Sequence, residues 1–147
     1  MTELEVYTDG AARGNPGRSA SGYSVYDKDR LVMERVVYNG VRTNNYAEYM
    51  AVIEALKWCR ARFDGKGTRL KVYSDSQIVV KQATGSYKTK SGLLKPLHEE
   101  LKRLCGCFLS VEFRNVPRSS SLVARVDRKL NTFLDGLERQ ESGEQQH

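Results

Sequence analysis

The chain has 147 residues, the size of one domain, and its 39% hydrophobic and 29% charged content is ordinary for a globular protein with a buried core. Its apolar stretches are short, and the opening MTELEVYTDG lacks a basic segment followed by an apolar one, so we expect no signal peptide, no membrane span and a cytoplasmic location. The net charge of +6 suits a polyanionic partner, although many proteins with such an excess bind none.

The N-terminal part of the chain predicts three strands. Leu4 to Thr8 alternates apolar and polar residues, and the glycines, proline and serines that follow in GAARGNPGRSASG indicate a turn. Two further alternating runs, SGYSVYD and LVMERVVY, are separated by the turn-like KDR. We therefore expect a three-stranded antiparallel meander.

The rest of the chain predicts helices that alternate with two strands. A helix is expected from Asn44 to about Arg62, because residues 48, 51, 52, 55 and 59 fall on one face. The later elements are a strand in RLKVYSD, helices in SQIVVKQATG and LLKPLHEELKRLC, a strand in FLSVEFRNV, and a helix near Val123 to Leu137. This order predicts one α/β domain over residues 1–137, with a mixed sheet flanked by helices, and a polar, disordered tail over residues 138–147.

Asp9 and Asp75 share a local pattern. Each acid follows a strand-like run, in Tyr-Thr-Asp-Gly and Tyr-Ser-Asp-Ser, and is in phase with the tyrosine two residues earlier. If the two strands are parallel neighbours, both acids emerge at the edge where ligands usually bind in open α/β sheets. Taken singly, each acid is better explained as a turn former.

Two helical acids point to the same place. Glu48 lies on the apolar face of the first helix, and Asp127 lies on the face of the last helix that carries Val123, Leu130 and Leu134. Four carboxylates brought together repel by about 3 kcal/mol per pair at about 5 Å, so a positive partner must offset them. Hard divalent cations suit such oxygen ligands, and two of them would support phosphodiester hydrolysis. Alternatively, Glu48 serves the helix dipole and Asp127 pairs with Arg125 or Arg128.

Four segments occur in an order that resembles ribonuclease H type 1. They are YTDGAARGNPG, TNNYAEYMAVIEAL, YSDSQIVVKQ and ARVDRKLN, and the resemblance covers residues 4 to about 135. The first three segments are specific because each places acids, asparagines or glycines together in a matching element, whereas the last is short. The resemblance implies a ribonuclease H-like five-stranded mixed sheet with its first three strands antiparallel.

The resemblance also implies an activity and its residues. Asp9, Glu48, Asp75 and Asp127 match the metal-binding, catalytic acids of the family, which implies two Mg²⁺ ions, with Mn²⁺ as a substitute. The implied substrate is an RNA/DNA hybrid, whose RNA strand the family cleaves to 3′-hydroxyl and 5′-phosphate ends. A monomer is the default expectation for a chain of this size. Substrate-binding positions are matched by Asn15, Thr43, Asn44, Asn45 and Gln77. The amides suit a 2′-hydroxyl and Thr43 a phosphate of the DNA strand, although Asn44 or Asn45 would also serve as a helix cap.

The chain departs from the family in two segments. Relatives often carry a His or Glu that assists catalysis before the fourth acid, and the loop here, Pro117 to Leu122, contains neither. Many bacterial members have a basic, Trp-containing protrusion, and this compact chain has only GSYKTKSG with Lys88 and Lys90. Two alternatives therefore stay open: a hybrid-binding module without catalysis, and a related nuclease of the superfamily that acts on DNA.

Overall fold

The structure is a computed structural model that describes residues 1–85 and 92–145. The described elements are β1 (Thr2–Gly14), β2 (Gly17–Asp27), β3 (Arg30–Arg42), α1 (Asn44–Arg62), a short 3-10 helix (Gly65–Gly67), β4 (Thr68–Ser74), α2 (Gln77–Ala83), α3 (Lys95–Cys105), β5 (Ser110–Asn115) and α4 (Ser121–Gln145). The expected order of strands and helices is confirmed. The segment GSYKTKSG lies largely outside the described residues.

The five strands form one mixed sheet in the order β3-β2-β1-β4-β5. β1 pairs antiparallel with β2, and β2 pairs antiparallel with β3, as the meander predicts. β4 pairs parallel with both β1 and β5. The acids that follow the pairs Tyr7–Tyr73 and Thr8–Ser74 are therefore brought level with each other at one end of the β1–β4 ladder.

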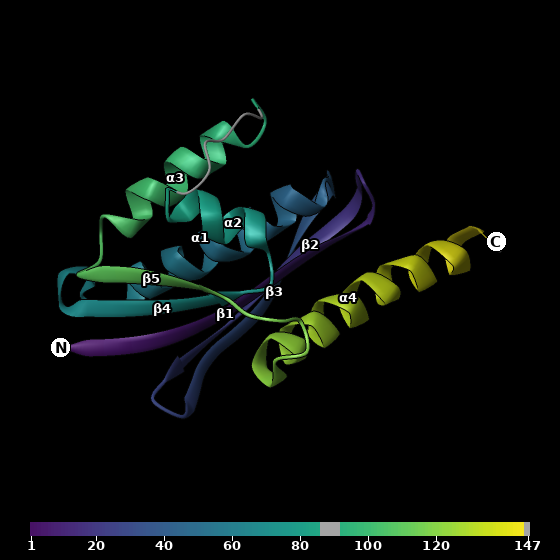
Figure 1. The fold of residues 1–147 in the computed structure, drawn as a ribbon. Helices are drawn as coiled ribbons and strands as arrows, with labels where there is room; N and C mark the ends of the chain where they lie inside the picture. Colours follow the sequence, from purple (N-terminus) through teal and green to yellow (C-terminus); the bar gives the residue numbers. More distant parts are fainter. Residues whose placement is uncertain (86–91, 146–147) are drawn as a thin grey trace.

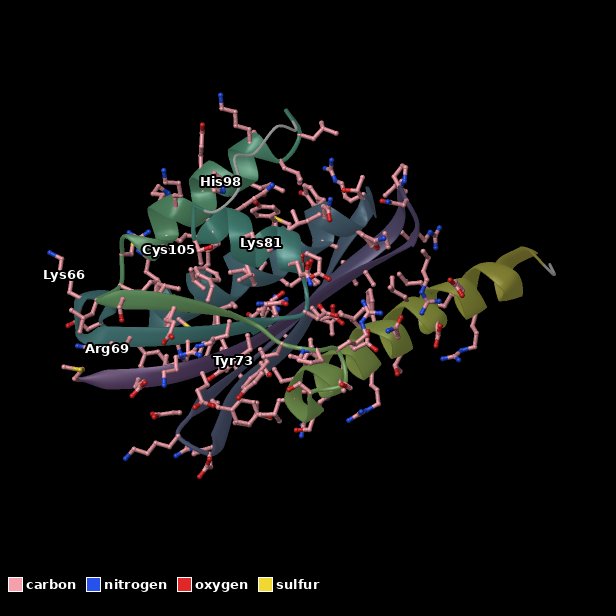
Figure 2. The ribbon with its side chains drawn as sticks, viewed as in Figure 1. Lys66, Arg69, Tyr73, Lys81, His98 and Cys105 are labelled. Carbon is pink, nitrogen blue, oxygen red and sulfur yellow. The ribbon has the colours of Figure 1, made fainter. Side chains whose placement is uncertain are left out.

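Helices cover both faces of the sheet and create two cores. Figure 1 shows α1, α2 and α3 on one side of the strands and α4 on the other. Alternate residues of a strand point to opposite faces, so Val6 packs in the core under α1 while Tyr7 packs in the core under α4. Tyr73, labelled in Figure 2, stacks on Tyr7 with ring centroids 4.9 Å apart. The next odd residue, Asp9, thus belongs to the α4 face.

The first turn is much shorter than the sequence predicts. β1 continues to Gly14 and β2 begins at Gly17, so most of GAARGNPGRSASG is paired strand and only Asn15-Pro16 forms the turn. The small residues serve close packing as well as turning, since a Cβ on Gly22 would lie 2.8 Å from Val126 Cγ1 of α4. Composition alone cannot separate these two uses of glycine.

The last helix is longer than expected. α4 runs from Ser121 to Gln145, so residues 138–145 of the expected disordered tail are helical in this structure. Side chains of the extension contribute contacts, because Glu138 Oε1 accepts a hydrogen bond from Arg13 of β1 at 3.0 Å. None of the helices within the described residues has the length and apolar character needed to cross a membrane.

Candidate metal centre and nucleic-acid interface

Asp9 and Asp75 stand where β1 and β4 separate. The β1–β4 ladder ends at Thr8 and Ser74, and each acid is the next residue of its strand. Asp9 is fully buried, and the Asp75 side chain is 10% exposed. The sequence expectation that these two acids meet at one sheet edge is confirmed by this register.

Glu48 reaches the same point from α1. Its carboxylate Oε1 accepts a hydrogen bond from the Gly10 backbone N–H at 3.1 Å, and that N–H also lies 2.9 Å from Asp9 Oδ1. The helix can approach this closely because residue 10 has no side chain: a Cβ there would lie 2.4 Å from the Ala47 carbonyl carbon. The Asp-Gly pair is therefore a packing requirement, and β1 does not turn at Gly10.

Asp127 approaches from α4, on the opposite face of the sheet. Its carboxyl is one of the groups that raise the pKa of Asp9, which puts it near the central acids. Asn131 donates to Asp127 Oδ1 at 3.1 Å. The expected partner Arg125 instead pairs with Glu34 of β3 at 2.8 Å, so the ion-pair alternative fails for that residue.

The acids perturb one another strongly. Burial is the largest cause that raises the pKa of Asp9, and the charges of Glu48 and Asp75 raise it further. Burial also raises the pKa of Glu48, followed by the charge of Asp75, while a hydrogen bond from Asp9 lowers it. Without a cation, burial and mutual repulsion therefore favour the protonated form of these buried carboxyls. Perturbed carboxyls of this kind mark functional sites.

The three central acids fit a divalent cation. One oxygen from each of Asp9, Glu48 and Asp75 lies within 4.8 Å of the others. Each acid also has one buried oxygen without a hydrogen-bond partner, namely Asp9 Oδ2, Glu48 Oε2 and Asp75 Oδ1. Unpartnered buried oxygens are costly, and hard oxygen ligands are what Mg²⁺ and Mn²⁺ prefer. The three carboxylates and their unpartnered oxygens therefore fit a divalent ion.

Most of the expected substrate-binding residues gather in one groove. Asn15, Thr43 and Asn45 line a groove of about 430 Å³ beside the β1–β2 turn. Asn44 links to the same turn, because its backbone N–H donates to Asn15 Oδ1 at 3.1 Å and its Oδ1 accepts from Ala12 N–H at 2.7 Å. These contacts hold the turn against the start of α1.

Two of the substrate candidates differ from that group. The helix cap is Thr43 and neither asparagine, since Thr43 Oγ1 accepts from Tyr46 N–H at 3.2 Å. Gln77 lies elsewhere, as the exposed first residue of α2, two residues after Asp75. Its position beside the acids is compatible with a substrate contact but is separate from the groove.

The family model for RNase H matches residues 1–115. The chain belongs to the RNase H family. It is 35% identical to ribonuclease HI of Halobacterium salinarum over 133 residues, which is 90% of this chain and 64% of that protein. The crystal structure of that RNase H1 superposes with a TM-score of 0.83 over 91% of this chain and 98% of the solved chain, at 34% identity.

Two further relatives support the family. The bifunctional protein Rv2228c of Mycobacterium tuberculosis is 31% identical over 90% of this RNase H chain, which spans only 36% of that protein's length. LC11-RNase H1 in complex with an RNA/DNA hybrid is 33% identical, with a TM-score of 0.81 over 88% of this chain and 94% of that one. The ribonuclease H-like fold expected from the sequence is confirmed.

This RNase H also carries a residue at its acids that sequence reasoning missed. Arg118 Nε lies 2.9 Å from Asp75 Oδ2, in the loop where the sequence offers no His or Glu. The loop is held in place because Val116 N–H donates to Ser74 O at 2.9 Å. The hydrogen bond to Asp75 raises the pKa of Arg118, and the charges of Asp9 and Asp127 add to that shift. The signal was available as an arginine in a short loop leading to the fourth acid.

Proposed function

We propose that this RNase H hydrolyses the RNA strand of RNA/DNA hybrids and leaves 3′-hydroxyl and 5′-phosphate ends. The observation that carries the proposal is the meeting of Asp9, Glu48 and Asp75, each with one unpartnered buried oxygen. Asp127, next to Asp9, is the proposed fourth ligand. The LC11-RNase H1 complex, at 33% identity, supports the choice of substrate.

Four acids mark the proposed place of reaction. Asp9, Glu48, Asp75 and Asp127 would hold two Mg²⁺ ions, with Mn²⁺ as a substitute. When bound, such ions supply a nucleophile at neutral pH and stabilise charge on the attacking and leaving oxygens. The Gly10 N–H holds Glu48 in place, so the ligand geometry is set before substrate arrives.

The groove at the β1–β2 turn supports the proposal that the protein recognises a hybrid. Asn15 and Asn45 line this groove and Asn44 adjoins it; because Asn15 Oδ1 and Asn44 Oδ1 already accept backbone N–H groups, their amide nitrogens would donate to ribose hydroxyls, the groups that distinguish RNA from DNA. Thr43, in the same groove, is proposed to contact a phosphate of the DNA strand. Gln77, two residues after Asp75, is proposed to contact ribose hydroxyls or the minor groove of the hybrid.

The test is cleavage of an end-labelled RNA/DNA hybrid with Mg²⁺, with Mn²⁺ and with chelator, beside single-stranded RNA, RNA duplex and DNA duplex. We expect metal-dependent loss of the hybrid's RNA strand alone. Asp9→Asn should abolish cleavage and keep hybrid binding, while Asp29→Asn, an exposed acid of the β2–β3 turn, should leave both unchanged. Salt-sensitive binding without cleavage would indicate a binding module, and cleavage of DNA a related nuclease.

We also propose that the protein is a cytoplasmic monomer. Cys59, Cys105 and Cys107 are all free thiols, which is typical of a reducing compartment. Size-exclusion chromatography with light scattering would test the oligomeric state, and a mass near 16.7 kDa is expected. A dimer mass would contradict this part of the proposal without affecting the metal centre.

A further inference from the structure

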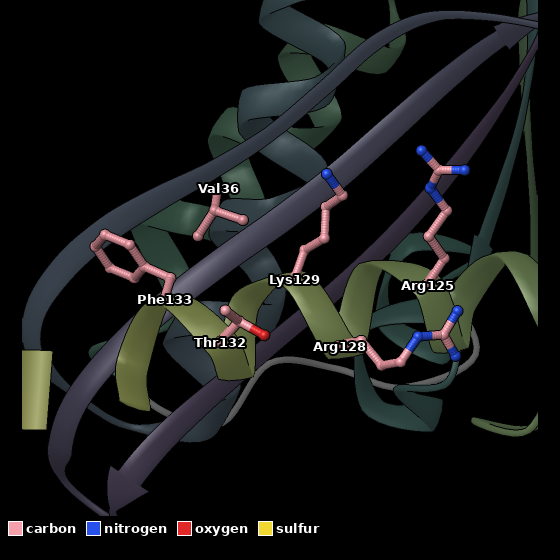
Figure 3. Close-up of a pocket in the computed structure, with 6 residues that line it drawn as sticks. All are labelled: Val36, Arg125, Arg128, Lys129, Thr132 and Phe133. Carbon is pink, nitrogen blue, oxygen red and sulfur yellow. The ribbon is translucent and has the colours of Figure 1, made fainter. Parts of the chain in front are cut away.

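Asp127 differs from the other three acids in what holds it. It lies on α4, a helix tied to the sheet by side chains: near its start, Arg125 and Lys129 both pair with Glu34 of β3. Figure 3 shows these two cations extending from α4 across the strands. These ion pairs hold the helix on the sheet but do not contact the Asp127 carboxylate, so another group must set the orientation of that carboxylate.

Asn131, one helical turn later, makes that contact. Its Nδ2 donates to Asp127 Oδ1 at 3.1 Å and to the Asp127 carbonyl at 2.9 Å. Its Oδ1 accepts from Arg13 Nη2 at 3.0 Å, and its carbonyl accepts from the same nitrogen at 3.3 Å. A guanidinium has donors only, so Arg13 forces the amide oxygen of Asn131 toward itself and the amide nitrogen toward Asp127.

Arg13 is itself held from its outer side. Asp135 and Glu138 of α4 lie 2.8 and 3.0 Å from its guanidinium. Arg13 belongs to β1, four residues after Asp9, and its side chain is 30% exposed. Exposed ion pairs contribute little to stability, so this arrangement is poorly explained as a device for keeping the fold together. The innermost group of this network, however, is the Asp127 carboxylate, the proposed fourth metal ligand.

We propose that Asn131, oriented by Arg13, is a positioning residue that fixes the Asp127 carboxylate for metal binding. The bond to Oδ1 stops rotation of the carboxylate and leaves Oδ2 available for the ion. Groups behind a metal ligand commonly orient it in this way. The role rests on the proposed function, because Asp127 is a metal ligand only there.

The experiment measures Mn²⁺ binding to the full chain by calorimetry, together with kcat and KM for hybrid cleavage. The variants are Asn131→Ala, Asn131→Gln, Asp127→Asn and the double variant Asn131→Ala with Asp127→Asn. Thr132→Ala, an exposed neighbour on α4, is the matched control. Thermal unfolding with chelator checks that each variant is folded.

We expect Asn131→Ala to weaken Mn²⁺ binding about tenfold and to lower kcat with little change in KM. Asn131→Gln should recover part of the loss, and Thr132→Ala should behave as wild type. If Asn131 acts through Asp127, the double variant loses no more than Asp127→Asn alone. Fully additive losses, or unchanged Mn²⁺ binding in Asn131→Ala, would overturn the role. A wild-type chain that binds no Mn²⁺ would instead overturn the metal centre itself.

Discussion

The two helical acids are placed by different means on the two faces of the sheet. Glu48 is 7% exposed, and a backbone N–H of β1 holds its carboxylate, because Gly10 lets α1 approach the strand. Asp127 is partly buried, and its carboxylate is held by Asn131 of the same helix, which Arg13 orients. An acid fixed by backbone packing tolerates few sequences around it, whereas an acid fixed by side chains depends on two or three separated positions.

The largest effect should come from removing the backbone-held acid. Glu48→Gln keeps the shape of the side chain but loses a ligand charge at the centre of the cluster, so kcat/KM should fall by about 10³-fold or more. Asp127→Asn removes an acid outside the three-acid group, and we expect a fall of about 10²-fold. Hybrid cleavage kinetics at saturating Mg²⁺ measure both. Equal losses would remove the distinction between the two faces.

Adding a methyl group where α1 or α4 approaches the sheet should also lower the free energy of unfolding by different amounts. An added Cβ in Gly10→Ala meets backbone atoms of Ala47 and Glu48, which cannot move without shifting α1, so we expect a loss of about 3 kcal/mol or more. The added Cβ in Gly22→Ala meets the Val126 side chain, which can rotate, and about 1 to 2 kcal/mol is expected. Denaturant unfolding gives both free energies, and a larger loss for Gly22→Ala would contradict the comparison.

The buried acids also predict how stability depends on pH. The pKa values of Asp9 and Glu48 are raised in the folded chain, mainly by burial and then by neighbouring charge. Such groups contribute stability fully below their ordinary pKa of about 4, and the contribution is lost as pH rises through the folded values. In chelator, the Tm should therefore fall from about pH 5 upward, and less steeply in Asp9→Asn.

Divalent metal should reverse this trend. The ions bind the ionised carboxylates, so Mg²⁺ should raise the Tm more at high pH than at low pH, and Mn²⁺ affinity should rise with pH. A chelator-treated wild type whose Tm is as flat with pH as that of Asp9→Asn would contradict the assignment of the raised pKa values to this cluster.

The sequence predicted most of the fold and the central acids for the same physical reason. Alternation along the strands and the helical spacing of residues 48, 51, 52, 55 and 59 reflect burial, so the meander, α1 and the placing of Asp9 and Asp75 on neighbouring parallel strands were predicted. The limits of the first turn and of α4 were wrong, because glycines that permit close packing resemble turn glycines, and polar residues past Leu137 continue a helix as readily as they end one. Long-range ion pairs leave no local pattern.

Arg118 forms such a long-range ion pair with Asp75, and removing its side chain should give the smallest effect of these substitutions. Its side chain is 65% exposed, so loss of the contact to Asp75 should change the free energy of unfolding by no more than about 1 kcal/mol. It occupies Asp75 Oδ2, and its charge lowers the pKa of Glu48, so it competes with a cation for the acids. Arg118→Ala should therefore tighten Mn²⁺ binding a few-fold at low ionic strength, and less so in high salt, where exposed charges are screened. Arg114→Ala, whose side chain pairs with Glu112, is the matched control. Weaker Mn²⁺ binding in Arg118→Ala would show that the arginine supports the ion rather than competing with it.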